Sequence, residues 1–143
     1  MNWLFYALVT ILLYGAHDVL LKHLSDQTNA LVASLVINIS AAVGIAVALA
    51  FSYWQNQLTG ARPGNREMWM LLIAGVCLGL ATVTFMKAFG NGGAFSVVVP
   101  LVYVGIILAS LLVGKLFFHE KITPVQIAGI VLSCIGLVLV VKK

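Results

Sequence analysis

The chain has 143 residues, of which 62% are hydrophobic and only 8% are charged. A soluble domain carries about 25% charged residues, and a soluble chain this apolar would expose hydrophobic patches that it could not keep in water. The composition therefore indicates an integral membrane protein and excludes a soluble catalytic domain. The net charge of +4 does not indicate a nucleic-acid partner, because the basic residues are scattered over the connecting segments.

Five long apolar segments fill most of the chain, at residues 3–24, 30–54, 68–89, 94–118 and 123–141. A helix needs roughly 20 apolar residues to cross about 30 Å of hydrocarbon, so each segment is long enough to span a bilayer. We therefore expect an all-α integral membrane protein with five transmembrane helices, folded as one domain over residues 1–143. An odd number of crossings places the two termini on opposite sides of the membrane. Five helices also match one inverted-repeat half of a ten-helix transporter.

The segments that join these helices carry turn and capping residues. Pro63 and Gly64 predict an irregular connection over residues 55–67. Thr123 followed by Pro124 predicts the N-cap and the first position of the last helix. The first segment lacks a basic leader and polar residues interrupt its second half, so we expect a retained helix and not a signal peptide.

The eight basic residues are divided evenly between the two predicted membrane faces. One face carries Arg62, Arg66, Lys115 and Lys121, and the other carries Lys22, Lys87, Lys142 and Lys143. Because an excess of Lys and Arg on one side sets orientation, this balance favours a chain that inserts in both directions, although an even split also arises by chance. The aromatic belt argues against dual insertion, since its members all fall at one face: Trp3, Tyr53, Trp54 and Trp69.

The chain contains no metal-ligand spacing, nucleophile motif or phosphate-binding loop. We therefore expect no enzyme activity, no catalytic residue, no metal and no cofactor. Cys77 and Cys134 fall within predicted spans and are interpreted as small apolar fillers. The few polar residues inside the spans are the remaining candidates for function.

Asp18 is the only acidic residue well inside an apolar segment. A charge at the bilayer centre costs about 2.5–3.5 kcal/mol on insertion scales, so its carboxyl should face protein or water. Removal from water favours the proton-bound form of a carboxyl, which a proton-coupled site requires. The alternative is a local ion pair with Lys22, one turn later on the same helix face. His17 should point elsewhere on the helix, as an interfacial or inter-helix hydrogen-bonding residue.

Other polar residues of the spans extend this candidate site. Asn38 is the strongest polar group of the second span, with an inter-helix hydrogen bond as its alternative role. Pro100 should kink the fourth helix, about one turn before Tyr103. The predicted substrate-binding or coupling cavity near the midplane is lined by Tyr14, Asp18, Asn38, Thr82, Pro100 and Tyr103. Glu120, in the last connection, is interpreted as a capping or surface residue.

Small residues at intervals of four or seven predict where helices touch, because they let two backbones approach closely. The predicted helix-packing or dimer contacts are Gly75, Gly79, Gly129, Ser133 and Gly136. Such faces suit a seam between helices of one chain or between two chains.

The run GAFSVVVPLVYVGIILASLLVGKLFFHEKITPVQIAGIVLSCIGLVLV resembles the end of the EamA-type repeat unit of drug/metabolite transporters. The resemblance depends on Ala94, Pro100, Glu120, Gln126, Gly129 and Gly136 in that order. Upstream, Tyr14 and Gly15 stand where that unit usually has Trp-Gly, and Lys22 closes the helix. Two-repeat members carry two such units in opposite orientation. One unit in this chain therefore implies an antiparallel homodimer, with membrane lipid as its other partner.

Two departures leave the substrate class open. Small multidrug resistance transporters place a membrane-embedded Glu where this chain has Tyr14, so their proton/drug antiport is not carried over. The Arg that many EamA units have early in the second span is also missing, and Asn38 is the nearest polar residue. The resemblance implies a multi-pass protein of the cell membrane, in a prokaryote the inner membrane, that moves a small organic solute or metabolite by alternating access. The alternatives are a flippase for a lipid-linked sugar or other amphipathic lipid, and a non-transport membrane subunit of a hetero-oligomer.

Overall fold

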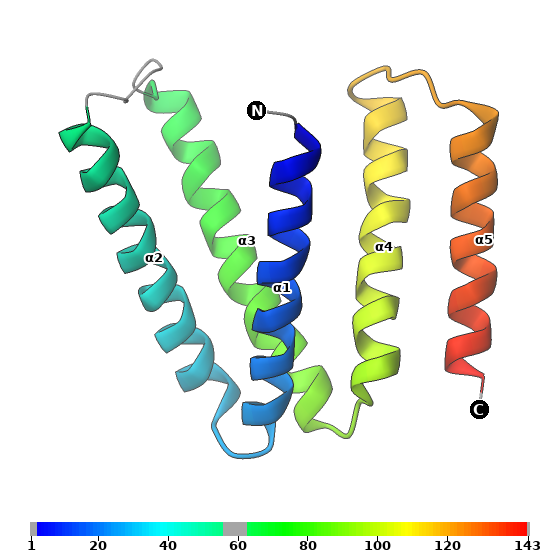
Figure 1. Ribbon diagram of the computed structural model, residues 1–143, viewed down its shortest axis with the longest axis horizontal. Helices are drawn as coiled ribbons and strands as arrows, with labels where there is room; N and C mark the ends of the chain where they lie inside the picture. Colours follow the sequence, from blue (N-terminus) through cyan, green and yellow to red (C-terminus); the bar gives the residue numbers. More distant parts are fainter. Residues whose placement is uncertain (1–2, 56–62, 143) are drawn as a thin grey trace. The chain divides into compact units, whose positions relative to one another are not determined.

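The computed structural model describes residues 3–55 and 63–142 and contains five long α-helices within these ranges. They are α1 (Trp3–Ser25), α2 (Ala30–Trp54), α3 (Asn65–Gly90), α4 (Phe95–Leu116) and α5 (Pro124–Val141), shown in Figure 1. All five are long and apolar enough to cross a membrane. The predicted all-α fold with five transmembrane helices is confirmed. Arg62 and Lys143, which enter the predicted charge balance, lie outside the described residues.

Helix ends follow local capping chemistry. The side chain of Asn29 accepts the Leu31 N–H at 2.9 Å and caps α2. At the start of α5, Thr123 and Gln126 form a reciprocal capping box, with the Thr123 N–H donating to Gln126 Oε1 at 2.7 Å. Pro124 takes the first helical position. The predicted start of the last helix is therefore correct.

Two helix ends differ from the ends of the predicted spans by two or three residues. Helix α3 begins at Asn65 instead of Met68, because the carbonyl of Gly64 already accepts the Met68 N–H at 2.9 Å. Helix α4 ends at Leu116 instead of Phe118. The chain turns there because His119 takes a positive φ of 52° and the Glu120 N–H donates back to the Gly114 carbonyl at 3.0 Å.

The chain divides into two compact units, Met1–Gly90 and Asn91–Lys143. We call the first the three-helix unit and the second the α4–α5 hairpin. In the three-helix unit, α3 packs against both α1 and α2. Its buried apolar core is Leu21, Met86 and Phe89. At the ends of α1 and α3 the backbones come so close that a Cβ on Gly90 would lie 3.2 Å from the Ser25 carbonyl oxygen.

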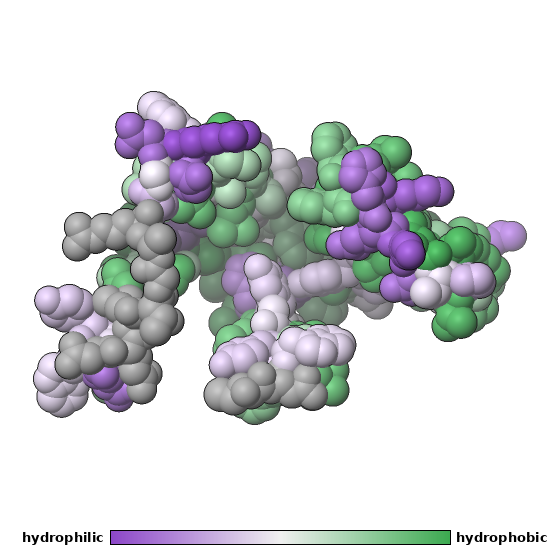
Figure 2. All heavy atoms as spheres, turned by 90° about the horizontal axis from the view of Figure 1, so that it is seen from above, coloured by the Kyte–Doolittle hydropathy of each residue, from purple (hydrophilic) through white to green (hydrophobic). Residues whose placement is uncertain are grey.

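In the α4–α5 hairpin the two helices pack against each other, and α4 runs without a break through Pro100. Gly114 is the buried residue of α4, and no described residue of α5 is buried. Figure 2 looks down on the helix ends: hydrophilic residues gather over the ends, and hydrophobic residues cover the helix sides. This is the distribution expected of helices whose sides face lipid and whose ends face water.

The aromatic belt has the predicted one-sided placement within the three-helix unit. Trp3 begins α1, Tyr53 and Trp54 end α2, and Trp69 lies in the first turns of α3. Figure 1 shows these helix ends at the same end of the unit. All four side chains are exposed, as expected for aromatic residues that contact lipid headgroups.

Candidate functional site

Asp18 is buried in the second half of α1, with only 2% of its surface exposed. The His17 Nδ1 lies 3.1 Å from Asp18 Oδ1, and the His17 ring packs edge-on against Tyr14, with 6.2 Å between the ring centroids. Three neighbouring side chains of α1 therefore form one cluster around the buried carboxyl. The prediction that His17 points elsewhere on the helix is wrong, because its ring turns toward Asp18.

Lys22 does not supply the local ion pair that was the alternative role for Asp18. Its ammonium lies 3.7 Å from the exposed Asp26 carboxylate, one turn further along the chain. It also lies 5.9 Å from the centre of the Phe89 ring, close enough for a cation–π contact. Lys22 therefore faces the end of α3, and Asp18 has His17 as its neighbour.

Thr82 is buried on α3, in the same part of the unit where α1 and α3 pack. Its hydroxyl donates to the Leu78 carbonyl at 2.9 Å, within its own helix. The Thr82 proton is therefore used locally, and its oxygen keeps lone pairs that can accept a hydrogen bond. Tyr14, by contrast, is exposed on the side of α1.

Asn38 lines a groove between α2 and α3 with a volume of about 290 Å³. We call it the α2–α3 groove, and its lining residues are Leu31, Ser34, Leu35, Asn38, Gly75, Gly79 and Val83. The Asn38 amide donates to the Ser34 carbonyl at 2.7 Å, so this donor serves its own helix and not a neighbouring one. Ser34 is buried, and its hydroxyl has no hydrogen-bond partner. An unsatisfied buried hydroxyl costs about 1–3 kcal/mol, and sequence reasoning did not single it out.

The glycines predicted at helix-packing or dimer contacts have open space beside them in the described part of the chain. A Cβ added at Gly75, Gly79, Gly129 or Gly136 would meet no atom within 4 Å. The Ser133 hydroxyl donates to the Gly129 carbonyl at 2.9 Å on the same helix. These faces are open, and their contact with a second chain stays a prediction.

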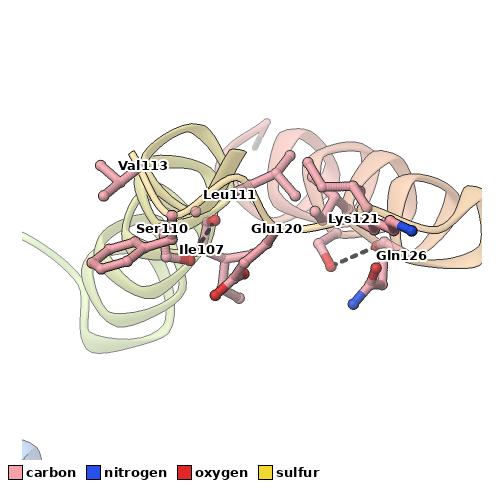
Figure 3. A pocket seen from close by; sticks show the side chains of 13 residues that line it. Ile107, Ser110, Leu111, Val113, Glu120, Lys121 and Gln126 are labelled. Atoms are coloured by element: carbon pink, nitrogen blue, oxygen red, sulfur yellow. Dashed lines mark hydrogen bonds between the residues drawn. The ribbon is translucent and has the colours of Figure 1, made fainter. Parts of the chain in front are cut away.

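A larger pocket of about 690 Å³ lies between α4 and α5, at the end where the two helices are connected. We call it the hairpin pocket; Figure 3 shows it, and its lining residues are Ile107, Ser110, Leu111, Val113, Gly114, Phe118, Glu120, Lys121, Ile122, Gln126, Gly129, Ile130 and Ser133. Sequence reasoning placed Glu120 in a capping or surface role and did not find this pocket. The missed signal is Gly114, which leaves room for the Glu120 side chain: a Cβ there would lie 2.9 Å from Glu120 Oε2.

Pro100 and Tyr103 are half-buried on α4 and line neither the α2–α3 groove nor the hairpin pocket. The predicted cavity residues therefore belong to both units, with Tyr14, Asp18, Asn38 and Thr82 in the three-helix unit and Pro100 and Tyr103 in the hairpin. Within the described ranges, no three His, Cys, Asp or Glu side chains cluster so as to hold a metal ion. Cys77 and Cys134 are free.

Helices with apolar sides, hydrophilic ends and a buried intramembrane carboxyl define a multi-pass membrane protein. The EamA-like transporter family matches residues 1–142, and the chain belongs to that family. The family consists of membrane transporters of small solutes, not of enzymes, and the match is consistent with a single EamA repeat unit of the drug/metabolite transporter superfamily. Comparisons with curated proteins and with solved structures found no match.

Proposed function

We propose that the protein moves a small organic solute across the cell membrane by alternating access, as an antiparallel homodimer. The buried Asp18 carboxyl carries this proposal, because ionisable side chains inside membrane spans are costly and mark transport or proton pathways. Asp18 would bear the charge or the proton that couples to solute movement. His17, 3.1 Å away, would orient the carboxyl.

The proposed cavity near the midplane uses Tyr14, Asp18, Asn38 and Thr82 of the three-helix unit, while a contribution of Pro100 and Tyr103 from the hairpin stays a prediction. Thr82 and Asn38 offer hydrogen-bond acceptors, since the Thr82 hydroxyl proton and one proton of the Asn38 amide are used within their own helices. Transporters built from inverted repeats bind solutes near the midplane at the repeat interface. A second copy inserted upside down would supply the missing repeat.

The open small-residue faces support the dimer. Gly136 has free space above it, and α5 buries no described residue. Membrane helices associate through such faces because backbones can approach closely there. The even division of basic residues over the two membrane faces is what a chain that inserts both ways requires.

Transport is tested with purified protein in liposomes under an imposed pH gradient, with radiolabelled alanine, glucose and methylamine as probes. We expect Asp18→Asn to reduce uptake at least tenfold and to flatten its pH dependence. The matched control is Asp26→Asn, which removes the same charge from an exposed carboxylate next to Lys22. Unchanged uptake and unchanged pH dependence in Asp18→Asn would remove Asp18 from the mechanism.

The dimer is tested by cysteine labelling of each terminus in whole cells, in a chain with Cys77→Ala and Cys134→Ala. We expect membrane-impermeant reagent to label a fraction of both termini from outside, because the two copies are inverted. A single-site chain with cysteine at only one terminus is the control. Labelling of one terminus alone from outside would contradict the antiparallel dimer.

A further inference from the structure

The hairpin pocket places a carboxylate between two membrane helices. The Glu120 N–H donates to the Gly114 carbonyl at 3.0 Å, which turns the loop back over the end of α4. Because Gly114 has no side chain, Glu120 Oε2 can lie close to it. A Cβ added to Gly114 would be only 2.9 Å from this oxygen. Figure 3 shows the Glu120 side chain reaching back against α4. Gly114 and Glu120 therefore form one structural pair that positions the carboxylate at the mouth of the pocket.

The two serines that line the pocket present acceptors to it, whereas Lys121 and Gln126 carry donors, because Gln126 Oε1 already accepts the Thr123 N–H at 2.7 Å. Ser110 donates its hydroxyl proton to the Ile107 carbonyl at 2.9 Å, and Ser133 donates its own to Gly129 at 2.9 Å. Each hydroxyl oxygen is left with lone pairs that accept hydrogen bonds. Figure 3 shows the Lys121 ammonium pointing away from α4, on the far side of the mouth. The side of the pocket formed by Glu120 and Ser110 therefore suits a ligand that donates hydrogen bonds and carries positive charge.

The deeper wall of the pocket is mainly apolar. Ile107, Leu111 and Ile130 line it, and Ser133 on α5 lies farther from the connecting loop than Ile130. Ile107 lies about 14 Å from the end of α4 at 1.5 Å per residue, so the pocket reaches from the membrane surface well into the hydrocarbon. A polar mouth above an apolar wall fits an amphiphilic molecule, with its charged group near Glu120 and its hydrocarbon part toward Ile107.

We propose that the hairpin pocket binds the primary ammonium group of a small amphiphilic amine. A primary ammonium has three N–H donors, which can bind the carboxylate of Glu120 and the hydroxyl oxygen of Ser110, one turn before Gly114 on α4. Charge-assisted hydrogen bonds to a carboxylate are about twice as strong as neutral ones. The residues that line the hairpin pocket differ from those of the transport cavity proposed above, and binding to the pocket is measured without transport.

Binding is measured by isothermal titration of n-hexylammonium into the whole protein in detergent micelles at neutral pH, with empty micelles subtracted. Hexyltrimethylammonium has the same charge and a similar tail but no N–H donor. We expect the protein to bind hexylammonium at least tenfold more tightly than the quaternary ion. Equal affinity for the two ions would overturn the proposal.

Three variants test the contacts. We expect Glu120→Gln to weaken hexylammonium binding at least tenfold, and Ser110→Ala and Gly114→Ala to weaken it several-fold, the latter because the new methyl group displaces the carboxylate. The matched control is Glu67→Gln, which removes the same charge from a carboxylate in the three-helix unit and should leave binding unchanged. The proposal would be overturned if the Glu120→Gln variant bound hexylammonium as tightly as the unsubstituted protein. It would also be overturned if Glu67→Gln weakened binding as much as Glu120→Gln does.

The melting temperature of each variant shows whether it is folded, and the exposed position of Glu120 makes Glu120→Gln compatible with the fold.

A last experiment distinguishes a free amine from a lipid headgroup with the same chemistry. If phosphatidylethanolamine competes with hexylammonium in mixed micelles and phosphatidylcholine does not, the site binds the ammonium group of the lipid. No competition assigns it to a free amine. Because the Asp18 experiment measures transport and this one measures binding, either proposal can fail without the other.

Discussion

The three-helix unit and the α4–α5 hairpin differ in how exposed their polar side chains are. The three-helix unit buries Asp18, Ser34 and Thr82 beside an apolar core. In the hairpin, the described polar side chains remain accessible and line an open pocket. The reason is geometric: a third helix can cover the groove between two others, whereas a pair of helices has no interior. A polar residue in the first unit is therefore under packing constraint, and one in the second is available to a ligand.

The largest expected effect that tests this comparison is on stability. Phe89 is fully buried and stacks on Phe85, with 4.9 Å between ring centroids. Phe89→Ala should lower the free energy of unfolding by about 3 kcal/mol, within the range for Phe-to-Ala changes in packed interiors. Phe117→Ala, at an exposed position of the hairpin, should change it by less than about 0.5 kcal/mol. Unfolding in mixed SDS micelles measures both, and equal losses would contradict the difference between the units.

A second variant probes the close approach of α1 and α3. Gly90→Val should cost about 2 kcal/mol, as overpacking of a tight contact does, because even a Cβ would lie 3.2 Å from the Ser25 carbonyl oxygen. Gly44→Val is the control, since a Cβ there meets nothing within 4 Å. Unfolding in mixed SDS micelles measures the free energy of unfolding of both variants. Equal costs at the two glycines would show that α1 and α3 do not meet at this point.

The hairpin has its own local determinant of stability at the start of α5. Thr123→Ala removes the hydroxyl that accepts the Gln126 N–H at 3.3 Å. Loss of an N-cap side chain of this kind costs about 1 kcal/mol. Thr123→Ser keeps the cap and serves as the control. A loss as large with Ser as with Ala would assign the effect to the Thr methyl group and not to capping.

The smallest expected effect has the opposite sign. Ser34→Ala removes a buried hydroxyl that makes no hydrogen bond, so it should leave stability unchanged or raise it by up to about 1 kcal/mol. Thr82→Val removes a buried hydroxyl that does donate, at 2.9 Å, and should lower stability. Thermal unfolding in detergent compares the two. Destabilisation by Ser34→Ala would mean that its hydroxyl has a partner in the folded protein.

The sequence predicted local features well. Hydropathy located five spans within a few residues of the observed helices, and Thr123-Pro124 located the start of α5. The site was predicted less completely. Asp18 was recognised as an unusual intramembrane acid, but the turn of His17 toward it was not expected. The pairing of Gly114 with Glu120 was also missed, because each looks ordinary alone and their contact depends on how the loop after α4 folds back.

By itself the sequence determined that this chain is a five-helix membrane protein and, to within a few residues, where each helix begins and ends, since apolar length and capping are properties of neighbouring residues. Only the tertiary structure decided which polar groups are enclosed and which stay accessible. Burial depends on helices that are distant in sequence: α3 packs against α1 and α2 in the unit that encloses Asp18 and Ser34, and α5 and the loop after α4 frame Glu120. These contacts leave no periodic signal in the chain, because nearly every face of every helix is apolar.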